Sequence, residues 1–132
     1  MILVDSNVLM YAAGSEHPHK EPAVSFLDKV ARGEVPAAID AEVLQEIIHR
    51  YRSLNRWIEG RRVYSLARSI FPEVLAVTAE VMDRAKQLVD EYDSLSARGA
   101  IHAGVVNVYR LDGICTFDRD FDAIHDCRRV PL

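Results

Sequence analysis

The first seven residues constrain the fold of this chain more than any other stretch. Residues 1–4 form a short, continuous apolar run that leads directly into the acid Asp5 and two small polar residues, Ser6 and Asn7. Such a run is typical of a strand that is buried on both faces of a parallel sheet. In open α/β sheets, ligands bind just beyond the carboxyl ends of the strands. We therefore expect Asp5 to hold a metal ion or a polar ligand.

Bulk composition describes one ordinary globular domain that spans residues 1–132. Hydrophobic residues make up 49% of the chain and charged residues 27%, which are common values for such domains. No apolar run approaches the length of a transmembrane helix, and the apolar N-terminus lacks the basic start of a signal peptide. We expect a cytoplasmic protein with no membrane association. Its two cysteines, Cys115 and Cys127, predict neither a disulfide framework nor a zinc finger.

The charge is unevenly distributed. The formal net charge is −4, which argues against a nucleic-acid binder held by overall charge alone. Residues 49–68, however, contain six arginines and a single acid, Glu59. The more common interpretation is a solvated helix face. The alternative is a basic patch for RNA phosphates or an acidic partner, with these candidate contacts: Arg50, Arg52, Arg61 and Arg62.

Strands and helices alternate along the whole chain. Strands are predicted near residues 36–40, 73–77, 113–117 and 129–132, in addition to the first. Helices are predicted over residues 6–13, 22–32, 44–51, 57–70, 78–92 and 96–108, because apolar residues recur there with a helical period or follow a capping residue. In two of these helices, the period places Ile48, Met82 and Val89 on the buried face. The alternation predicts an α/β fold, a three-layer α/β/α sandwich with a mostly parallel central sheet of about four or five strands.

Two further acids belong with Asp5. Asp118 follows the strand predicted at 113–117 and repeats the pattern of Asp5, and Glu46 lies early on the helix after the strand at 36–40. Glu46 lies away from the apolar stripe of its helix, which fits a solvated residue as well as one that faces a pocket. Carboxylates that converge on one rim repel one another and tend to hold a cation. Oxygen ligands of this kind suit Mg²⁺ or Mn²⁺, which activate water and neutralise charge at a phosphodiester.

Other site classes are poorly supported. The chain contains no glycine-rich phosphate loop and no Gly-x-Ser-x-Gly elbow. A receiver domain would need a lysine after a late strand, and a haloacid-dehalogenase-like phosphatase would need an acid where Asn7 stands. His102 flanks an apolar stripe, where a satisfied, half-buried histidine is more common than a ligand.

Four sequence blocks resemble one family. Residues 2–9 (Ile-Leu-Val-Asp-Ser-Asn-Val-Leu), 43–48 (Val-Leu-Gln-Glu-Ile-Ile), 96–103 (Ser-Ala-Arg-Gly-Ala-Ile-His-Ala) and 116–121 (Thr-Phe-Asp-Arg-Asp-Phe) look like the motif blocks of PIN domains. Each block alone is loose, but the four occur in the right order and spacing over nearly the whole chain. The likeness is greatest to the VapC-type toxins of bacterial and archaeal toxin–antitoxin systems.

The resemblance implies an endoribonuclease that depends on Mg²⁺ or Mn²⁺, has an α/β/α fold and forms a homodimer. It also implies a VapB-type antitoxin that inserts a segment into the active-site groove. In this resemblance Asp5, Glu46 and Asp118 match the acidic metal ligands, and Ser6 and Asn7 match the polar residues beside the first acid. Asp122, one helical turn beyond Asp118, is a weaker candidate ligand.

Gly99 departs from the pattern of the family. PIN domains usually carry an acidic metal ligand at this position of the third block. The position is also unusual for a glycine, because it is the third residue of a helix that Ser96 is expected to cap; acids are favoured there and glycine costs about 1 kcal/mol relative to alanine. Three explanations stay open. The remaining acids bind a metal without a ligand at position 99, Asp93 or Asp122 takes the place of that ligand, or the nuclease activity of the protein is weakened or lost. A catalytically inactive module that binds RNA or a protein is the alternative function.

Overall fold

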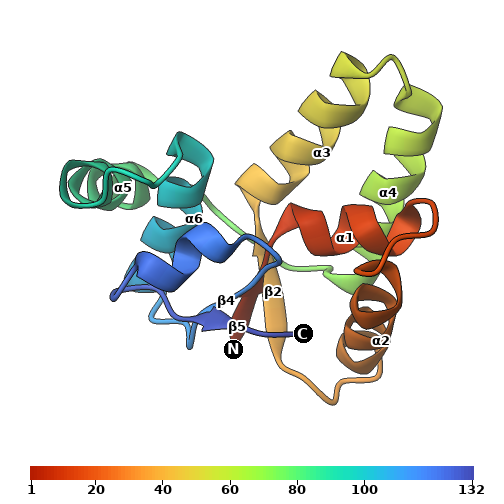
Figure 1. Ribbon diagram of the computed structural model, residues 1–132, viewed down its shortest axis with the longest axis horizontal. Coiled ribbons are helices and arrows are strands. Elements are labelled where there is room, and N and C mark those ends of the chain that lie inside the picture. The colour runs from red at the N-terminus through yellow and green to blue at the C-terminus, as the bar shows by residue number, and fades with distance from the viewer.

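Five short parallel strands form one sheet at the centre of the structure, a computed structural model that describes residues 1–132. Figure 1 shows the sheet edge-on between two groups of helices. The order of the strands is β3-β2-β1-β4-β5. Their bounds are β1 Ile2–Val4, β2 Ala37–Asp40, β3 Val74–Leu75, β4 Ile114–Cys115 and β5 Arg129–Val130. The central strand is therefore the N-terminal one, and Asp5 follows it directly.

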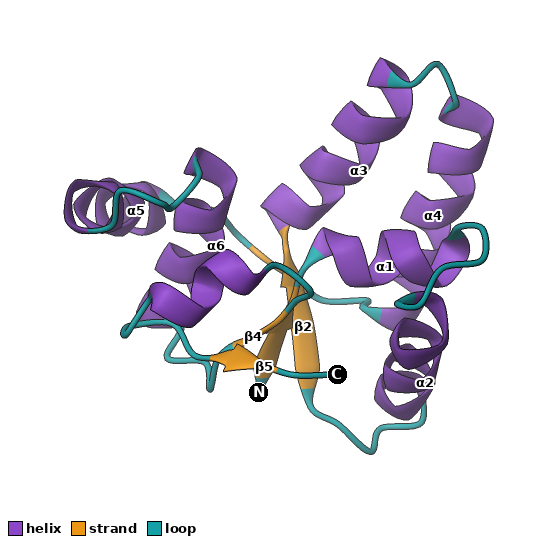
Figure 2. Ribbon diagram, in the orientation of Figure 1, coloured by secondary structure: helices purple, strands orange, loops and turns teal.

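Six α-helices cover the two faces of the sheet, as the secondary-structure colouring of Figure 2 shows. Four lie on one side and two, α5 and α6, on the other; α3 and α4 extend away from the sheet as an antiparallel pair. Their bounds are α1 Ser6–Ala13, α2 Lys20–Ala31, α3 Ala41–Ser53, α4 Trp57–Ile70, α5 Ala79–Glu91 and α6 Ala97–Val108, with a 3₁₀ helix, η1, at Arg119–Ala123. The predicted three-layer sandwich with a parallel sheet is confirmed.

Neighbouring residues of the central strands enter opposite halves of the core. Val4 and Cys115 pack in the cluster formed with α1 to α4, whereas Leu3 and Ile114 pack in the cluster formed with α5 and α6. This division follows from the two-residue period of a strand. All four side chains are fully buried. The apolar run at the N-terminus is thus buried on both faces, as predicted.

Side-chain caps fix the starts of three helices. Thr78 accepts a hydrogen bond from the backbone N–H of Val81, and Ser96 accepts one from the backbone N–H of Gly99, as expected from the sequence. Asp40 caps α3 in the same way, with its Oδ1 2.9 Å from the Val43 nitrogen. Each cap satisfies an N–H group that the helix itself cannot pair. No helix combines the length and the apolar character that a membrane span requires.

Three predicted core positions are wrong. Ile48, Met82 and Val89 expose 43%, 45% and 45% of their surfaces. α5 packs mainly against α6, and the buried residues of α3 are only Val43, Leu44, Ile47 and Tyr51. Each of these helices therefore buries a narrower stripe than its apolar period suggests.

Adjacent residues on α5 test this narrower stripe. We expect Leu88→Ala to lower the free energy of unfolding by about 2–5 kcal/mol, because Leu88 is fully buried and its truncation leaves a cavity. Val89→Ala, on the next residue, should change it by less than about 0.5 kcal/mol. Urea denaturation of both variants measures the difference. Equal losses would show that both residues are buried in solution.

Candidate functional site

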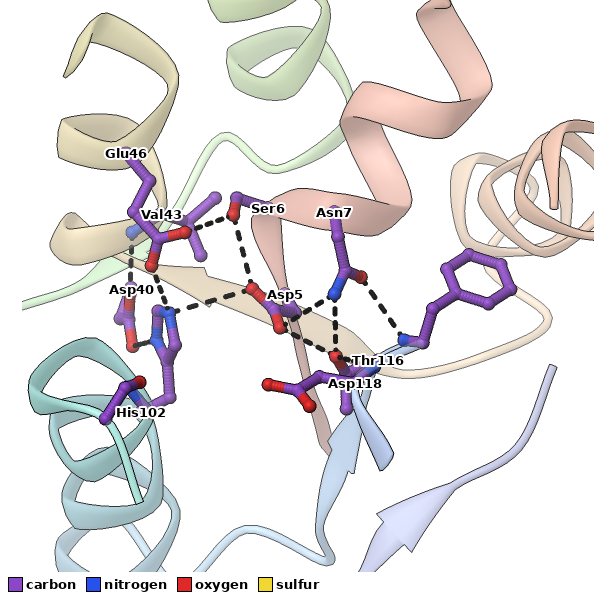
Figure 3. Close-up of polar contacts among 12 residues, drawn as sticks. Asp5, Ser6, Asn7, Asp40, Val43, Glu46, His102, Thr116 and Asp118 are labelled. Atoms are coloured by element: carbon purple, nitrogen blue, oxygen red, sulfur yellow. Dashed lines mark hydrogen bonds and ion pairs between the residues drawn. The ribbon is translucent and has the colours of Figure 1, made fainter. Parts of the chain in front are cut away.

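Asp5, Glu46 and Asp118 line one cavity of about 580 Å³ at the carboxyl ends of the strands. Asp5 lies between β1 and α1, Glu46 lies on the second turn of α3, and Asp118 follows β4. The three side chains come from three elements, because β1 pairs with β2 on one side and with β4 on the other. The sequence-predicted acids are thus brought to one place. Figure 3 shows their side chains and partners.

The carboxylate of Asp5 is held on both oxygens. Its Oδ2 accepts hydrogen bonds from the Thr116 hydroxyl at 2.7 Å and from the Asn7 amide at 3.2 Å, and its Oδ1 lies 3.2 Å from the Ser6 hydroxyl. Burial raises the pKa of Asp5, although His102 and Thr116 partly oppose the shift. A carboxylate that is buried, oriented and costly to ionise gains strongly from a nearby cation.

Asn7 and Thr116 connect Asp5 to the segment that carries Asp118. Asn7 donates to the Thr116 hydroxyl at 2.9 Å and accepts from the backbone N–H of Phe117. The Thr116 hydroxyl also accepts from the backbone N–H of Asp118 at 3.0 Å. The first and the fourth sequence blocks are therefore parts of one hydrogen-bond network. Sequence reasoning missed Thr116, although its place just after a strand and two residues before an acid is a usable signal.

Glu46 faces the site and not the solvent. Its Oε2 accepts a hydrogen bond from the Ser6 hydroxyl at 2.5 Å, and its Oε1 lies 2.8 Å from His102 Nε2. Burial by itself would raise the pKa of Glu46, but the hydrogen bonds and charge of His102, with Ser6, lower it on balance. The helical period allowed Glu46 to face either the solvent or a pocket, and in the structure it faces the pocket.

His102 bridges two carboxylates and is almost entirely buried, with 2% of its surface exposed. Its Nδ1 lies 2.7 Å from Asp40 Oδ2, and its Nε2 faces Glu46. Because ionised carboxylates only accept hydrogen bonds, both ring nitrogens carry protons in this arrangement. Burial opposes this charge, but Asp40, Glu46 and Asp5 together raise the pKa of His102 well above its usual value.

The expectation of a satisfied His102 holds, because both ring nitrogens have partners, but the side chain is almost fully buried and not half-buried. Ser96, Gly99 and His102 follow one another at three-residue spacing on α6, and all three line the cavity. That spacing places them on one helix face. It is the signal that sequence reasoning did not use. Asp40 was missed for a different reason, since its role depends on a partner 62 residues away.

A side chain at Gly99 would belong to the lining of this cavity, but its Cβ atom would fit only if close neighbours shift. A Cβ atom added there would lie 3.1 Å from Leu95 Cδ1 and from the Ser96 hydroxyl, and 3.5 Å from the ring of Phe121. These neighbours are side chains, which can shift by a few tenths of an ångström. An acid at this position would extend the set of carboxylates around the cavity.

Oxygen donors dominate the chemistry of the cavity. Ligand atoms of Asp5, Glu46 and His102 all lie within 4.8 Å of one another. Asp118 lies outside this group but lines the same cavity. Because His102 is engaged by Asp40 and Glu46, the donors available to a metal are carboxylate oxygens. This donor set fits a hard divalent cation.

The other candidate acids lie elsewhere. Asp122 forms a two-point ion pair with Arg129, at 2.6 and 3.1 Å, and does not line the cavity. Asp93 is exposed in the turn before α6 and also lies outside the cavity lining. The structure therefore brings neither of them to the position that Gly99 leaves open.

Arginines surround the cavity, but not the set that the sequence predicted. Arg50 lines it, whereas Arg52, Arg61 and Arg62 do not. The lining also includes two arginines that sequence reasoning missed: Arg56 and Arg98. Arg56 pairs with Glu59, while neither Arg50 nor Arg98 forms a salt bridge with any acid.

The buried histidine predicts a pH dependence of stability. The pKa of His102 is higher in the folded than in the unfolded chain, so the folded state binds its proton more tightly. This contribution to stability is fully present below about pH 6.5, the unfolded value, and is lost as the pH rises through the folded pKa. We expect the free energy of unfolding to fall above about pH 6.5 in EDTA.

His102→Gln should remove that slope, and His125→Gln, at an exposed histidine outside the cavity, should retain it. Urea titrations between pH 6 and 9 measure it for all three proteins. The same slope in His102→Gln and in the parent would contradict a charged His102 in the folded state.

Comparison with known proteins agrees with this geometry. The family model described as PIN domain matches residues 2–126. The chain is 36% identical to Ribonuclease VapC13 of Mycobacterium tuberculosis and to VapC ribonuclease Mb1869c of Mycobacterium bovis; each match covers 98% of this chain and 99% of the relative. It is 31% identical to Ribonuclease VapC23 of Mycobacterium tuberculosis, over 89% of this chain and 93% of that protein.

Solved structures share the fold. VapBC2 from Rickettsia felis, bound to a DNA fragment of its promoter, matches with a TM-score of 0.78 and 16% identity over 99% of this chain and 98% of that one. FitAcB from Neisseria gonorrhoeae matches with a TM-score of 0.76 and 18% identity over 98% and 96%. The extent of the family match and the identity to the mycobacterial proteins leave one conclusion: this chain belongs to the PIN domain family.

Proposed function

We propose that this protein is a metal-dependent endoribonuclease and the toxin of a type II toxin–antitoxin module, acting on RNA in the cytoplasm. The observation that carries the proposal is the convergence of Asp5, Glu46 and Asp118 in one cavity, with Asp5 oriented on both oxygens. Relatives that cover nearly the whole chain are named as ribonucleases. Hydrolysis of a phosphodiester requires an activated water molecule and neutralisation of the negative charge on the phosphate. A cation held by clustered carboxylates provides both.

Mg²⁺ or Mn²⁺ would be held by Asp5, Glu46 and Asp118. When bound, such an ion activates water and neutralises charge at the phosphodiester. The protein's own contribution is to orient the ligands. Asn7 and Thr116 fix Asp5, while Ser6 and His102 fix Glu46. These contacts hold the two carboxylates in place without the side-chain reorganisation that a mobile pair would need.

Arg50 and Arg98 are the proposed contacts for RNA phosphates. Both line the cavity beside the acids and neither is engaged in a salt bridge. Unpaired cations that line the same cavity as a metal site attract the backbone of a substrate. Arg52, Arg61 and Arg62, on α3 and α4, remain proposed contacts for a longer RNA or for an acidic partner.

The proposed protein partners are a VapB-type antitoxin and a second copy of the chain. Two of the matching solved structures carry the names of toxin–antitoxin assemblies, one from Klebsiella pneumoniae and one from Rickettsia felis. The former has a TM-score of 0.71 and 20% identity over 97% of this chain and 96% of that one. An antitoxin segment seated in the cavity would exclude RNA from the acids.

A catalytically inactive module that binds RNA or protein is the second candidate function. Gly99 favours it, because the position faces the cavity and carries no ligand. The oriented Asp5 and Glu46 favour the enzyme, since a binding module has no need to bury and fix two carboxylates at a cost in stability.

Cleavage of a mixed RNA pool with Mn²⁺ tests the two functions. We expect the parent protein to cut RNA, and Asp5→Asn to lower the rate by roughly 100-fold or more because it weakens the metal site. Gly99→Asp should raise the rate by roughly tenfold, the equivalent of about 1.4 kcal/mol, because it adds a carboxylate to the site.

Asp5→Asn in the Gly99→Asp background is the control for a contaminating nuclease. Cleavage only by the Gly99→Asp protein would mean an intact fold with a disabled site. No cleavage by either protein would reject the enzyme and favour the binding module.

Charge reversal tests the phosphate contacts. We expect Arg50→Glu and Arg98→Glu each to weaken binding of a single-stranded RNA and to reduce the salt dependence of its binding constant by about 0.7 per lost contact. Arg110→Glu, at an exposed residue outside the cavity, is the matched control. Fluorescence anisotropy at several salt concentrations gives the slopes, and an unchanged slope in both variants would reject these contacts.

A further inference from the structure

Four aromatic rings form a cluster at one wall of the same cavity. The His19 ring stacks on Phe117, with centroids 4.1 Å apart and an interplanar angle of 14°. The Tyr11 ring meets Phe117 and His19 edge-on, at 5.3 and 5.0 Å. The His17 ring lies over Tyr11 at 4.6 Å, tilted by 34°. Tyr11 and His17 line the cavity together with the acids.

Only the inner part of this cluster belongs to the hydrophobic core. Tyr11 and Phe117 are partly buried and pack against the core, whereas His17 is exposed. Burial of apolar surface therefore explains the inner rings but not the position of His17. An exposed ring that packs against a supported ring, inside a site cavity, is available to a flat ligand.

Backbone contacts fix the outer ring in place. The backbone N–H of His19 donates to His17 Nδ1 at 3.0 Å, so Nδ1 is an acceptor and carries no proton in this contact. Lys20 Nζ donates to the carbonyl oxygen of Gly14 at 2.6 Å and closes the loop between α1 and α2. Little conformational freedom is therefore lost when a ligand packs on the ring.

The cluster lies one helical turn from the acids. Tyr11 follows Asn7 by four residues on α1, a rise of about 6 Å along the helix. Phe117 is the neighbour of Asp118, and its backbone N–H donates to Asn7. Tyr11 and Phe117 thus belong to the same two segments as Asp5 and Asp118.

From these contacts we propose that Tyr11 and His17 form a stacking wall for a nucleobase of single-stranded RNA, beside the phosphodiester that the acids address. This inference rests on the proposed ribonuclease function and adds the position of a base to it. Aromatic side chains next to unpaired cations are the usual means of binding single strands. A base reaches such a wall only when it is not stacked in a duplex, so the substrate is unpaired at this nucleotide.

Two variants of His17 separate stacking from loop structure. His17→Asn removes the ring but keeps an acceptor near the position of Nδ1, so the contact with the His19 N–H is retained. His17→Phe restores a ring without the imidazole nitrogens. His125→Asn, at an exposed histidine outside the cavity, is the matched control. All variants are made in an Asp118→Asn background and measured in EDTA, so that the RNA is not cut.

The probes are a fluorescein-labelled adenosine octaribonucleotide and an octamer of abasic ribose phosphates. Fluorescence anisotropy measures both affinities. We expect His17→Asn to weaken binding of the adenosine octamer by about 5-fold to 100-fold, the range of one base–aromatic stack, and to leave the abasic octamer unchanged. His17→Phe should retain most of the affinity for the adenosine octamer.

Each other outcome overturns the proposal in a distinguishable way. Unchanged binding of the adenosine octamer by His17→Asn means that no base stacks there, and the ring cluster is then a contact for a protein segment or only a support for the loop. An equal loss for both octamers means that His17 contacts the backbone. If the protein with native His17 binds neither octamer, no base stacks on this wall, and the cleavage assay with Mn²⁺ decides the ribonuclease function separately.

Discussion

The contacts of one buried histidine hold the site together. His102 bonds Asp40 at the start of α3 and Glu46 one and a half turns later, so a single ring from α6 fixes both the start and the orientation of the helix that presents Glu46. Its positive charge also offsets carboxylates that burial would otherwise make costly by several kcal/mol each. The position of α3 against α6, and with it the shape of the cavity, depends on this charge.

Local patterns were enough to predict the sheet and two of the acids. β1 is recognisable from its continuous apolar run, which Asp5 follows directly. Asp118 is recognisable because it follows the mostly apolar stretch 113–117, which contains β4. The parallel arrangement of the strands then requires both acids to lie at one edge. The apolar period failed to predict which residues are buried where a helix packs on one side only. The apolar period of α5 gives no sign that Val89 faces away from the core.

The pairings among the supporting residues of the site were beyond reach for a different reason. Asp40 and His102 are separated by 62 residues, and Asp5 and Thr116 by 111. No spacing rule connects residues so far apart, and a buried ion pair cannot be distinguished by sequence from a solvated histidine and aspartate. Glu46 was ambiguous because a residue off the apolar stripe can face either water or a polar cavity.

The place of β1 in the sheet has a consequence for how the protein is made. As the central strand, β1 pairs with β2 and with β4, which leaves the ribosome more than 100 residues later. The hydroxyl that orients Asp5 belongs to Thr116, in that same late segment. Partial chains therefore contain Asp5 but not the contacts that hold it. A nascent toxin of this architecture has no organised site until translation of the domain is nearly finished, which delays the onset of any activity relative to the synthesis of the chain.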